Sequence, residues 1–242
     1  NVEEYKEVIK KIENNFFKGL YILNSEEIFF LNDFTEKIKK IIPEDLKDLN
    51  QYIFYGNEIK ADDILLCAKK FPMMGDKQLI IVKNGNKILK EIDKIISQKQ
   101  SIPESTVLVV CLDGVKIDAK TKDLKINEEY GAIYDFKKIY DNKMPNWIKY
   151  LAQRSGFKID FKTCELIKER TGNNLSKVKI EFEKISLNTQ RAEITSDLIV
   201  EHFGINNDYN LFELQNEIGK KNYHKVFLIS DYFSKNSSYS IQ

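Results

Sequence analysis

The most constraining feature of this sequence is a series of short, continuous apolar runs separated by segments with helical periodicity. The run from Val107 to Leu112 is the strongest, with the length and β-branched content of a fully buried strand. Such strands, alternating with helices, predict a parallel sheet covered by helices on both faces. We expect strands at 19–23, 51–55, 79–82, 107–112 and 132–136, and helices at 2–16, 26–42, 61–70, 86–97 and, in a polar stretch, 116–128.

Strand signals disappear after Pro145, where the pattern becomes helical. Apolar residues at helical spacing predict three helices, which are separated by breaks at Gly156 and at 172–174. Helical patterns resume beyond residue 206. We therefore expect an α/β domain over 1–140, a linker near 141–143, a three-helix domain over 141–206, and the beginning of a further helical domain over 207–242.

Charge and cysteine content limit the classes of partner and compartment. With 38 Lys and Arg against 37 Asp and Glu, no whole-chain positive field would hold a phosphate backbone, so any DNA contact is local or shared. Cys67, Cys111 and Cys164 lie far apart, which favours a reduced, cytosolic protein. No segment approaches the roughly 20 apolar residues of a membrane span, and no signal peptide is recognisable. Because the chain starts without Met, we expect a fragment of a longer protein.

The connection after the first predicted strand bears on nucleotide binding. A nucleotide-binding α/β domain has a glycine-rich loop there, ending in Lys and Ser or Thr. This chain has the residues 24–29, Asn-Ser-Glu-Glu-Ile-Phe, which contain no Gly or Lys and include two carboxylates that would repel phosphate. We predict that the chain neither binds nor hydrolyses ATP, and we interpret Asn24 or Ser25 as a helix N-cap with acids in the first turn.

Other residue types that often carry chemistry stand alone in this sequence. Asp113 ends a predicted strand without a following Glu, which favours a turn residue over a metal ligand. His202 and His224 have no partner in a recognisable catalytic arrangement, and we expect both to be partly exposed helix residues. No catalytic residue, cofactor or metal site is therefore expected.

The segment Phe71-Pro72-Met73-Met74-Gly75-Asp76 lies between a predicted helix and a predicted strand. We expect Pro72 to end the helix, Phe71 to anchor that helix to the core, and Gly75 to turn the chain. Met73 and Met74 would then form a tip suited to an apolar pocket of a partner. The alternative, that both cover the sheet, stays open from these residues alone, although consecutive residues do not both face one core.

An ordered series of motifs resembles the delta subunit of the bacterial DNA polymerase III clamp loader. No one motif is decisive, but together they follow the family's order from residue 17 to about 218. They are 20–23 with the loop that follows, 71–84, 106–109, 147–148, 156–159, 172–175, 181–185 and 209–214.

The resemblance implies a RecA-like, AAA+-type domain without a working phosphate loop, then a helical lid and the start of a collar that joins the subunits. It implies that Met73 and Met74, with Phe71 and Pro72, form the element that binds and opens the sliding clamp (beta). The partners implied are the clamp, the gamma/tau and delta prime subunits through the collar, and primer–template DNA within the complex. A cytoplasmic, non-catalytic subunit of the polymerase holoenzyme is expected.

Two other functions remain open from the sequence. One is an active P-loop ATPase subunit of the same complex, against which residues 24–29 argue. The other is a non-enzymatic helical scaffold or nucleic-acid adaptor, which predicts that Met73 and Met74 are buried.

Overall fold

The computed structural model describes residues 2–116, 131–188, 192–195, 198–199 and 211–235. Contacts divide the chain into two compact units, Asn1–Ile139 and Tyr140–Gln242. The predicted linker at 141–143 forms a 3-10 turn, η5 (Asp141–Lys143), that leads directly into a helix. The predicted boundary near 206 and the predicted helix at 116–128 fall outside the described residues, apart from Lys116.

The first unit is built on a five-stranded sheet in the order β2-β3-β4-β1-β5. Every pairing is parallel, with Ile22 opposite Val110 on one side and Ile133 on the other. The predicted parallel α/β fold is therefore confirmed. The strands are β1 (Leu20–Ser25), β2 (Gln51–Tyr55), β3 (Gln78–Lys83), β4 (Thr106–Asp113) and β5 (Gly131–Phe136).

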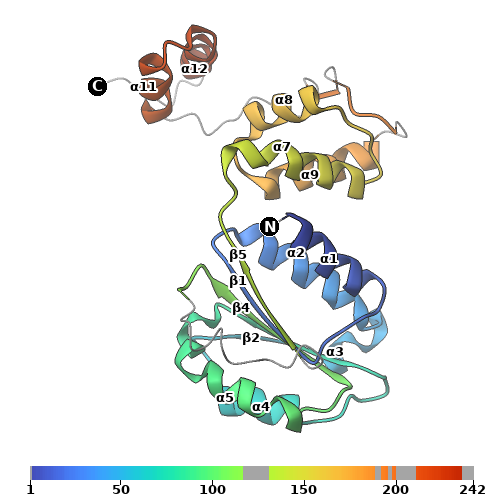
Figure 1. The fold of residues 1–242 in the computed structure, drawn as a ribbon. Helices are drawn as coiled ribbons and strands as arrows, with labels where there is room; N and C mark the ends of the chain where they lie inside the picture. Colours follow the sequence, from blue (N-terminus) through green and yellow to red (C-terminus); the bar gives the residue numbers. More distant parts are fainter. Residues whose placement is uncertain (1, 117–130, 189–191, 196–197, 200–210, 236–242) are drawn as a thin grey trace. The chain divides into compact units, whose positions relative to one another are not determined.

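Helices cover both faces of this sheet. Successive residues of a strand point to opposite faces, so each strand contributes apolar side chains to both helical layers. Ile22, Ile80 and Val110 face α4 and α5, where they join a cluster of buried aliphatic side chains. On the other face Tyr21 packs edge-on against Phe34 of α2, with ring centroids 5.2 Å apart. Figure 1 shows α1 and α2 on one side of the sheet and α4 and α5 on the other. The helices are α1 (Val2–Glu13), α2 (Ile28–Ile38), α3 (Lys47–Asn50), α4 (Ala61–Ala68) and α5 (Ile92–Ser97).

Several predicted helices are shorter than their apolar periodicity indicates. The first ends at Glu13, because Asn15 adopts a left-handed backbone with φ of 60°, and Phe16 is left exposed. The second begins only at Ile28 and passes into the 3-10 turn η1 (Lys39–Ile41). Much of the helix predicted at 86–97 is the 3-10 segment η3 (Gly85–Glu91). The remaining 3-10 turns of this unit are η2 (Glu44–Leu46) and η4 (Lys99–Ser101).

The second unit contains three helices around a core of their own, α7 (Met144–Arg154), α8 (Phe161–Thr171) and α9 (Leu175–Asn188). Trp147, Ile167 and Phe182 are among its buried side chains. The N-terminus of α8 is capped by Asp160, whose carboxylate accepts from the Thr163 amide at 2.6 Å. The helical pattern predicted for this region agrees with the described residues, in which the β-pairing is a single isolated bridge between Lys158 and Glu193.

Beyond them lies the helix pair α11 (Leu211–Gly219) and α12 (Tyr223–Lys235). The turn between them is held by Glu217, which accepts from Lys220 Nζ at 3.0 Å and from Asn222 Nδ2 at 2.9 Å. The hydrogen bond from Lys220 and then the other contacts hold the pKa of Glu217 below its usual value, despite the opposing effect of burial. Ile218, Tyr223 and Phe227 of this pair are exposed apolar side chains.

Candidate partner-binding tip

The segment between α4 and β3 carries three large exposed apolar side chains. Phe71 is 75% exposed, Met73 57% and Met74 84%, whereas Pro72 is half-buried. We call residues 71–76 the tip. The strands of the sheet are parallel, and the tip leads into β3. The tip therefore lies at the end of the sheet that carries the N-termini of the strands. Both methionine side chains are exposed, so they do not both cover the sheet, as the alternative predicted.

A buried asparagine from a different element holds the backbone of the tip. Asn50, the last residue of α3, is 1% exposed. Its Nδ2 donates to the Met73 carbonyl at 2.7 Å, and its Oδ1 accepts from the Met73 amide, also at 2.7 Å. Both backbone polar groups of Met73 are thus satisfied by one side chain, so the Met73 side chain is not needed to fix the chain there.

The chain bends over residues 73–76, which include Gly75 as predicted, but the residue with a left-handed backbone in this bend is Met74. Met74 has φ of 58°, in the left-handed region that costs a residue with a Cβ roughly 1–2 kcal/mol. Gly75 has a different role, because a Cβ there would lie 3.0 Å from Leu46 Cδ1 and 3.3 Å from Asn50 Nδ2. Gly75 therefore permits the close approach of the tip to η2 and α3.

The prediction that Phe71 anchors the preceding helix to the core is wrong. α4 ends at Ala68, before Phe71 and Pro72, so Phe71 lies outside the helix and its side chain is exposed. For the same reason Pro72 does not itself terminate the helix. The end of α4 is held instead by buried Gln78, whose Nε2 donates to the Cys67 carbonyl at 3.1 Å.

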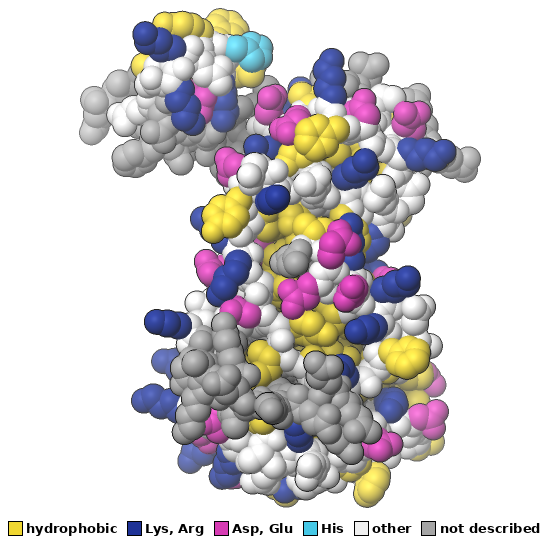
Figure 2. Space-filling view, in the orientation of Figure 1, with side chains coloured by type: hydrophobic (Ala, Val, Ile, Leu, Met, Phe, Trp, Pro, Cys, Tyr) yellow, Lys and Arg dark blue, Asp and Glu magenta, His cyan; other side chains and the backbone are white. Residues whose placement is uncertain are grey.

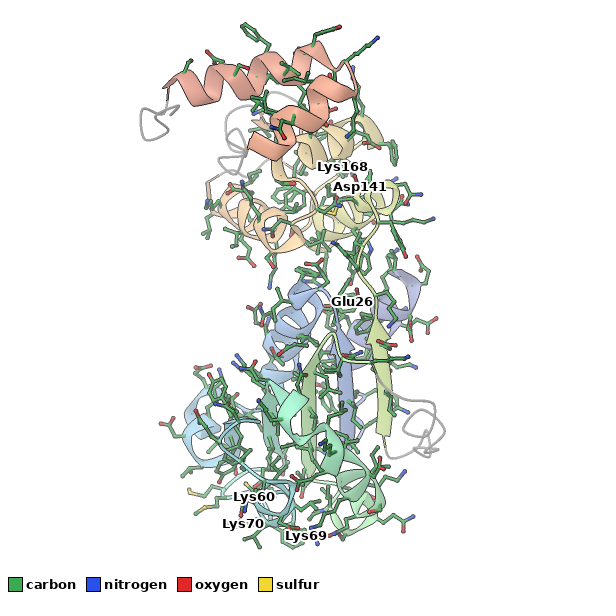
Figure 3. All side chains as sticks on the ribbon, turned by 90° about the vertical axis from the view of Figure 1, so that its left-hand side faces the viewer. Glu26, Lys60, Lys69, Lys70, Asp141 and Lys168 are labelled. Carbon is green, nitrogen blue, oxygen red and sulfur yellow. The ribbon has the colours of Figure 1, made fainter. Side chains whose placement is uncertain are left out.

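Three lysines flank the tip in sequence. Lys69 Nζ donates to Gln98 Oε1 at 2.9 Å, and Lys77 Nζ donates to the Glu104 carbonyl at 2.8 Å. Among the described residues, none of Lys69, Lys70 and Lys77 lies in an ion pair with a carboxylate. Figure 3 shows Lys69 and Lys70 at the end of the sheet opposite to Glu26.

That opposite end holds the connection where a nucleotide-binding domain has its phosphate loop. β1 runs to Ser25 and α2 begins at Ile28, so two residues join them. The Glu26 amide donates to the Phe136 carbonyl at 3.3 Å, and the Glu27 amide to Ser25 Oγ at 2.9 Å. The Glu26 N–H group is therefore used in pairing with β5, and the Glu27 N–H group is used within the turn.

The predicted N-cap role of Asn24 and Ser25 is wrong, because both residues belong to β1. The N-cap of α2 is Glu27, which makes no side-chain cap hydrogen bond, and the first turn of α2 has no acidic residue. Asn24 is 1% exposed; its amide donates to the Val115 carbonyl at 2.8 Å and accepts from the Val115 amide at 3.0 Å. The Asn24 amide also donates to Asp135 Oδ1 at 2.8 Å, which ties β1 to β5. Burial raises the pKa of Glu27, with an opposing contribution from Lys138.

The residues that stood alone in the sequence remain separate in the fold. Asp113 is the exposed last residue of β4, where the Asn86 side chain hydrogen-bonds its backbone, and burial raises the pKa of its carboxyl. His224 is an exposed residue of α12, and His202 lies outside the described residues. In the described segments, Cys67, Cys111 and Cys164 are free thiols, and no His, Cys, Asp and Glu side chains form a metal-binding group.

Helix hydropathy and the distribution of surface charge are two further properties of the described parts. None of their helices combines the length and apolar character needed to cross a membrane. Figure 2 shows Lys and Arg side chains interspersed with Asp and Glu over the visible face. That face therefore carries no large patch of a single charge sign among its described residues.

The sequence pointed to Met73 and Met74 as candidate clamp-binding residues but gave no indication of a role for Asn50. Asn50 is 23 residues away in sequence from Met73, and a lone Asn before a strand has many ordinary uses. Its role follows only from the pairing of β2 with β3, which begins at Gln51 opposite Leu79 and brings the two segments together.

Comparison with known proteins gives a consistent result. The family model for DNA polymerase III, delta subunit, matches residues 21–155, more than half of the chain. The DNA polymerase III subunit delta of Bacillus subtilis (strain 168) is 25% identical over 223 residues, covering 88% of this chain and 64% of the relative. A probable DNA polymerase III subunit delta of Aquifex aeolicus (strain VF5) is 20% identical over 224 residues, covering 88% and 63%.

A solved structure supports the fold independently. The Bacillus subtilis DNA clamp loader delta protein superposes with a TM-score of 0.79 at 24% identity, covering 96% of this chain and 72% of that chain. Measured against the two DNA polymerase III delta sequences from Bacillus subtilis and Aquifex aeolicus, the present chain spans somewhat less than two thirds of their length.

Proposed function

This chain belongs to the DNA polymerase III delta-subunit family, and from that premise we propose that it binds and opens the sliding clamp during clamp loading. The observation that carries the proposal is the tip, where Met73 and Met74 are exposed while the backbone of Met73 is held by Asn50. Exposed apolar side chains on a fixed backbone fit insertion into an apolar pocket, since little ordering entropy remains to be lost on binding.

Clamp opening requires no bond to be broken by this subunit. A tip that binds the open or strained ring better than the closed ring shifts the ring toward opening by that difference in affinity. The free energy comes from burying the methionine side chains, which are adaptable in shape and suit a pocket that changes during opening. ATP bound by other subunits would control when the tip becomes available.

We further propose that the chain is a non-catalytic subunit of the polymerase complex, without a nucleotide cofactor. The two-residue connection between β1 and α2 supports this, because phosphate-cradling loops are several residues longer and end in Lys. Glu26 and Glu27 would also repel phosphate charges there. The chain therefore depends on ATPase subunits in the same assembly.

The other partners follow from the same family premise. The exposed apolar side chains Ile218, Tyr223 and Phe227 of α11 and α12 suit a helical collar that joins the gamma/tau and delta prime subunits. Primer–template DNA would be contacted only as part of the complex, since the chain carries a formal net charge of +1. A cytoplasmic location agrees with this assignment and with three free thiols.

Binding of the purified chain to an immobilised bacterial sliding clamp tests the proposal. We expect saturable binding, and we expect the doubly truncated Met73→Ala/Met74→Ala chain to bind much more weakly while remaining folded. A Leu187→Ala chain is a matched control, because Leu187 is 87% exposed but lies on α9 in the other unit. No binding of the unaltered chain, or equal losses for both variants, would contradict a clamp-binding tip.

A further inference from the structure

We propose that Asn50 is a positioning residue that holds the tip in its binding conformation before any partner arrives. The inference rests on the proposed function, because the conformation concerned is the one that presents Met73 and Met74. Asn50 itself is buried and would not contact the clamp. Its effect on binding would be transmitted entirely through the Met73 backbone.

The geometry of the contact favours this role. One amide group satisfies both the carbonyl and the N–H of Met73 at 2.7 Å, which fixes the position and also the orientation of that peptide segment. The segment is short, because α4 ends at Ala68 and β3 begins at Gln78. Asn50 belongs to a different element, α3, and its two hydrogen bonds fix the backbone in the middle of this connection.

Backbone strain next to the contact indicates that the conformation is imposed. Met74 has φ of 58°, a left-handed conformation that is uncommon for residues other than Gly, Asn and Asp. The side chain of Met offers no polar group that would favour this conformation. Residues in such regions persist where the surroundings determine them, and they cluster at functional positions. Here the Asn50 contact precedes Met74, and the close packing of Gly75 against Leu46 follows it. Without Asn50, Met74 would be free to relax.

A purely structural role for Asn50 is the alternative, and the chain contains a suitable comparison. Asn24 is equally buried and makes the same two-point contact with the backbone of Val115. That contact lies at the end of β1, at the edge of the sheet opposite to the tip. If buried asparagines of this kind affected clamp binding only through overall stability, replacing either one would have a similar effect.

The expected consequence is a smaller binding-competent population. When a tip occupies its competent conformation for only a fraction of the time, the apparent dissociation constant rises by the inverse of that fraction. We expect Asn50→Leu, which has a similar shape but no hydrogen-bonding groups, to weaken clamp binding by about tenfold, equivalent to about 1.4 kcal/mol. The loss should appear mainly in the association rate, because the bound complex retains both methionines.

The experiment combines clamp-binding kinetics with amide hydrogen exchange on the full 242-residue chain. We expect Asn50→Leu to speed the exchange of the Met73 amide and to slow clamp association, whereas Asn24→Leu should do neither. In the Met73→Ala/Met74→Ala background, Asn50→Leu should have little further effect on clamp affinity, since its action passes through the tip. Unchanged affinity, an equal loss for Asn24→Leu, or full additivity would overturn the proposal.

A second variant covers the case in which Asn50→Leu does not fold. Gly75→Ala crowds Leu46 and Asn50 from the tip side, so it should also speed exchange at Met73 and weaken binding. No change in either measurement would overturn the positioning role. If the unaltered chain does not bind the clamp, the proposed function fails, but the exchange rate of the Met73 amide in Asn50→Leu still decides whether Asn50 holds the tip.

Discussion

Truncating both tip methionines to Ala should reduce clamp affinity strongly and stability only slightly. Each truncation removes three heavy atoms, worth roughly 2.4 kcal/mol at about 0.8 kcal/mol per buried group. Met73 is 57% exposed and Met74 84%, so at most about 1.4 and 2.0 kcal/mol of that remain to be gained in a pocket. We therefore expect a loss of about 2 to 3.4 kcal/mol for the pair, or roughly 30- to 300-fold in affinity.

The same arithmetic limits the effect on folding. The parts of the two side chains that are already buried are worth at most about 1.4 kcal/mol, so the unfolding midpoint in urea should change little. Clamp affinity by surface plasmon resonance and the unfolding curve should be measured on the same preparations. A loss of binding below about threefold, or a loss that merely follows a collapse in stability, would refute the reasoning.

Three further outcomes can be checked on the isolated chain. Calorimetry with Mg²⁺ and ATP should detect no micromolar binding, and a measurable affinity would contradict the reading of the β1–α2 connection. Tyr5→Phe removes the buried hydrogen bond from the Tyr5 hydroxyl to Asp33 Oδ2 at 2.5 Å, so the free energy of unfolding should fall by about 1.5–3 kcal/mol. Tyr21→Phe, which loses only a bond from a backbone amide, should cost less in the same urea titration. Burial, and then Asp113, raise the pKa of Cys111 to about 12. A thiol reagent at pH 8 should therefore modify half-buried Cys67 first and Cys111 only on unfolding, and the stability conferred by that neutral thiol should decline as the pH rises above about 9.

Local patterns in the sequence were enough to predict the α/β architecture. The buried strands are visible because each is a continuous apolar run, as at 79–82 and 107–112, and both faces of each are covered. The missing phosphate loop is equally local, since glycines and a Lys are either present after the first strand or they are not. The tip could be proposed from the sequence because its signal is also local: two adjacent methionines stand directly between a Pro and a Gly.

Helix ends and side-chain roles were predicted less well, because they depend on contacts that the local sequence does not contain. Periodicity extended the first helix to Phe16, but a single left-handed residue, Asn15, ends it earlier. Asn24 and Ser25 have the chemistry of an N-cap, yet pairing with β4 and β5 extends β1 through both residues and so moves the start of the helix. Phe71 was expected in the core and is exposed.

The sequence by itself determined that this chain forms a parallel sheet without a phosphate loop. It also determined that two methionines lie between the helix that follows the second strand, α4, and the third strand, β3. Only the tertiary structure decided how those methionines are presented. Asn50 reaches Met73 because β2 and β3 pair in register, which brings together residues 23 positions apart. A hydrogen bond of that kind depends on the positions of both partners in space, and neither residue's neighbours in the sequence encode it.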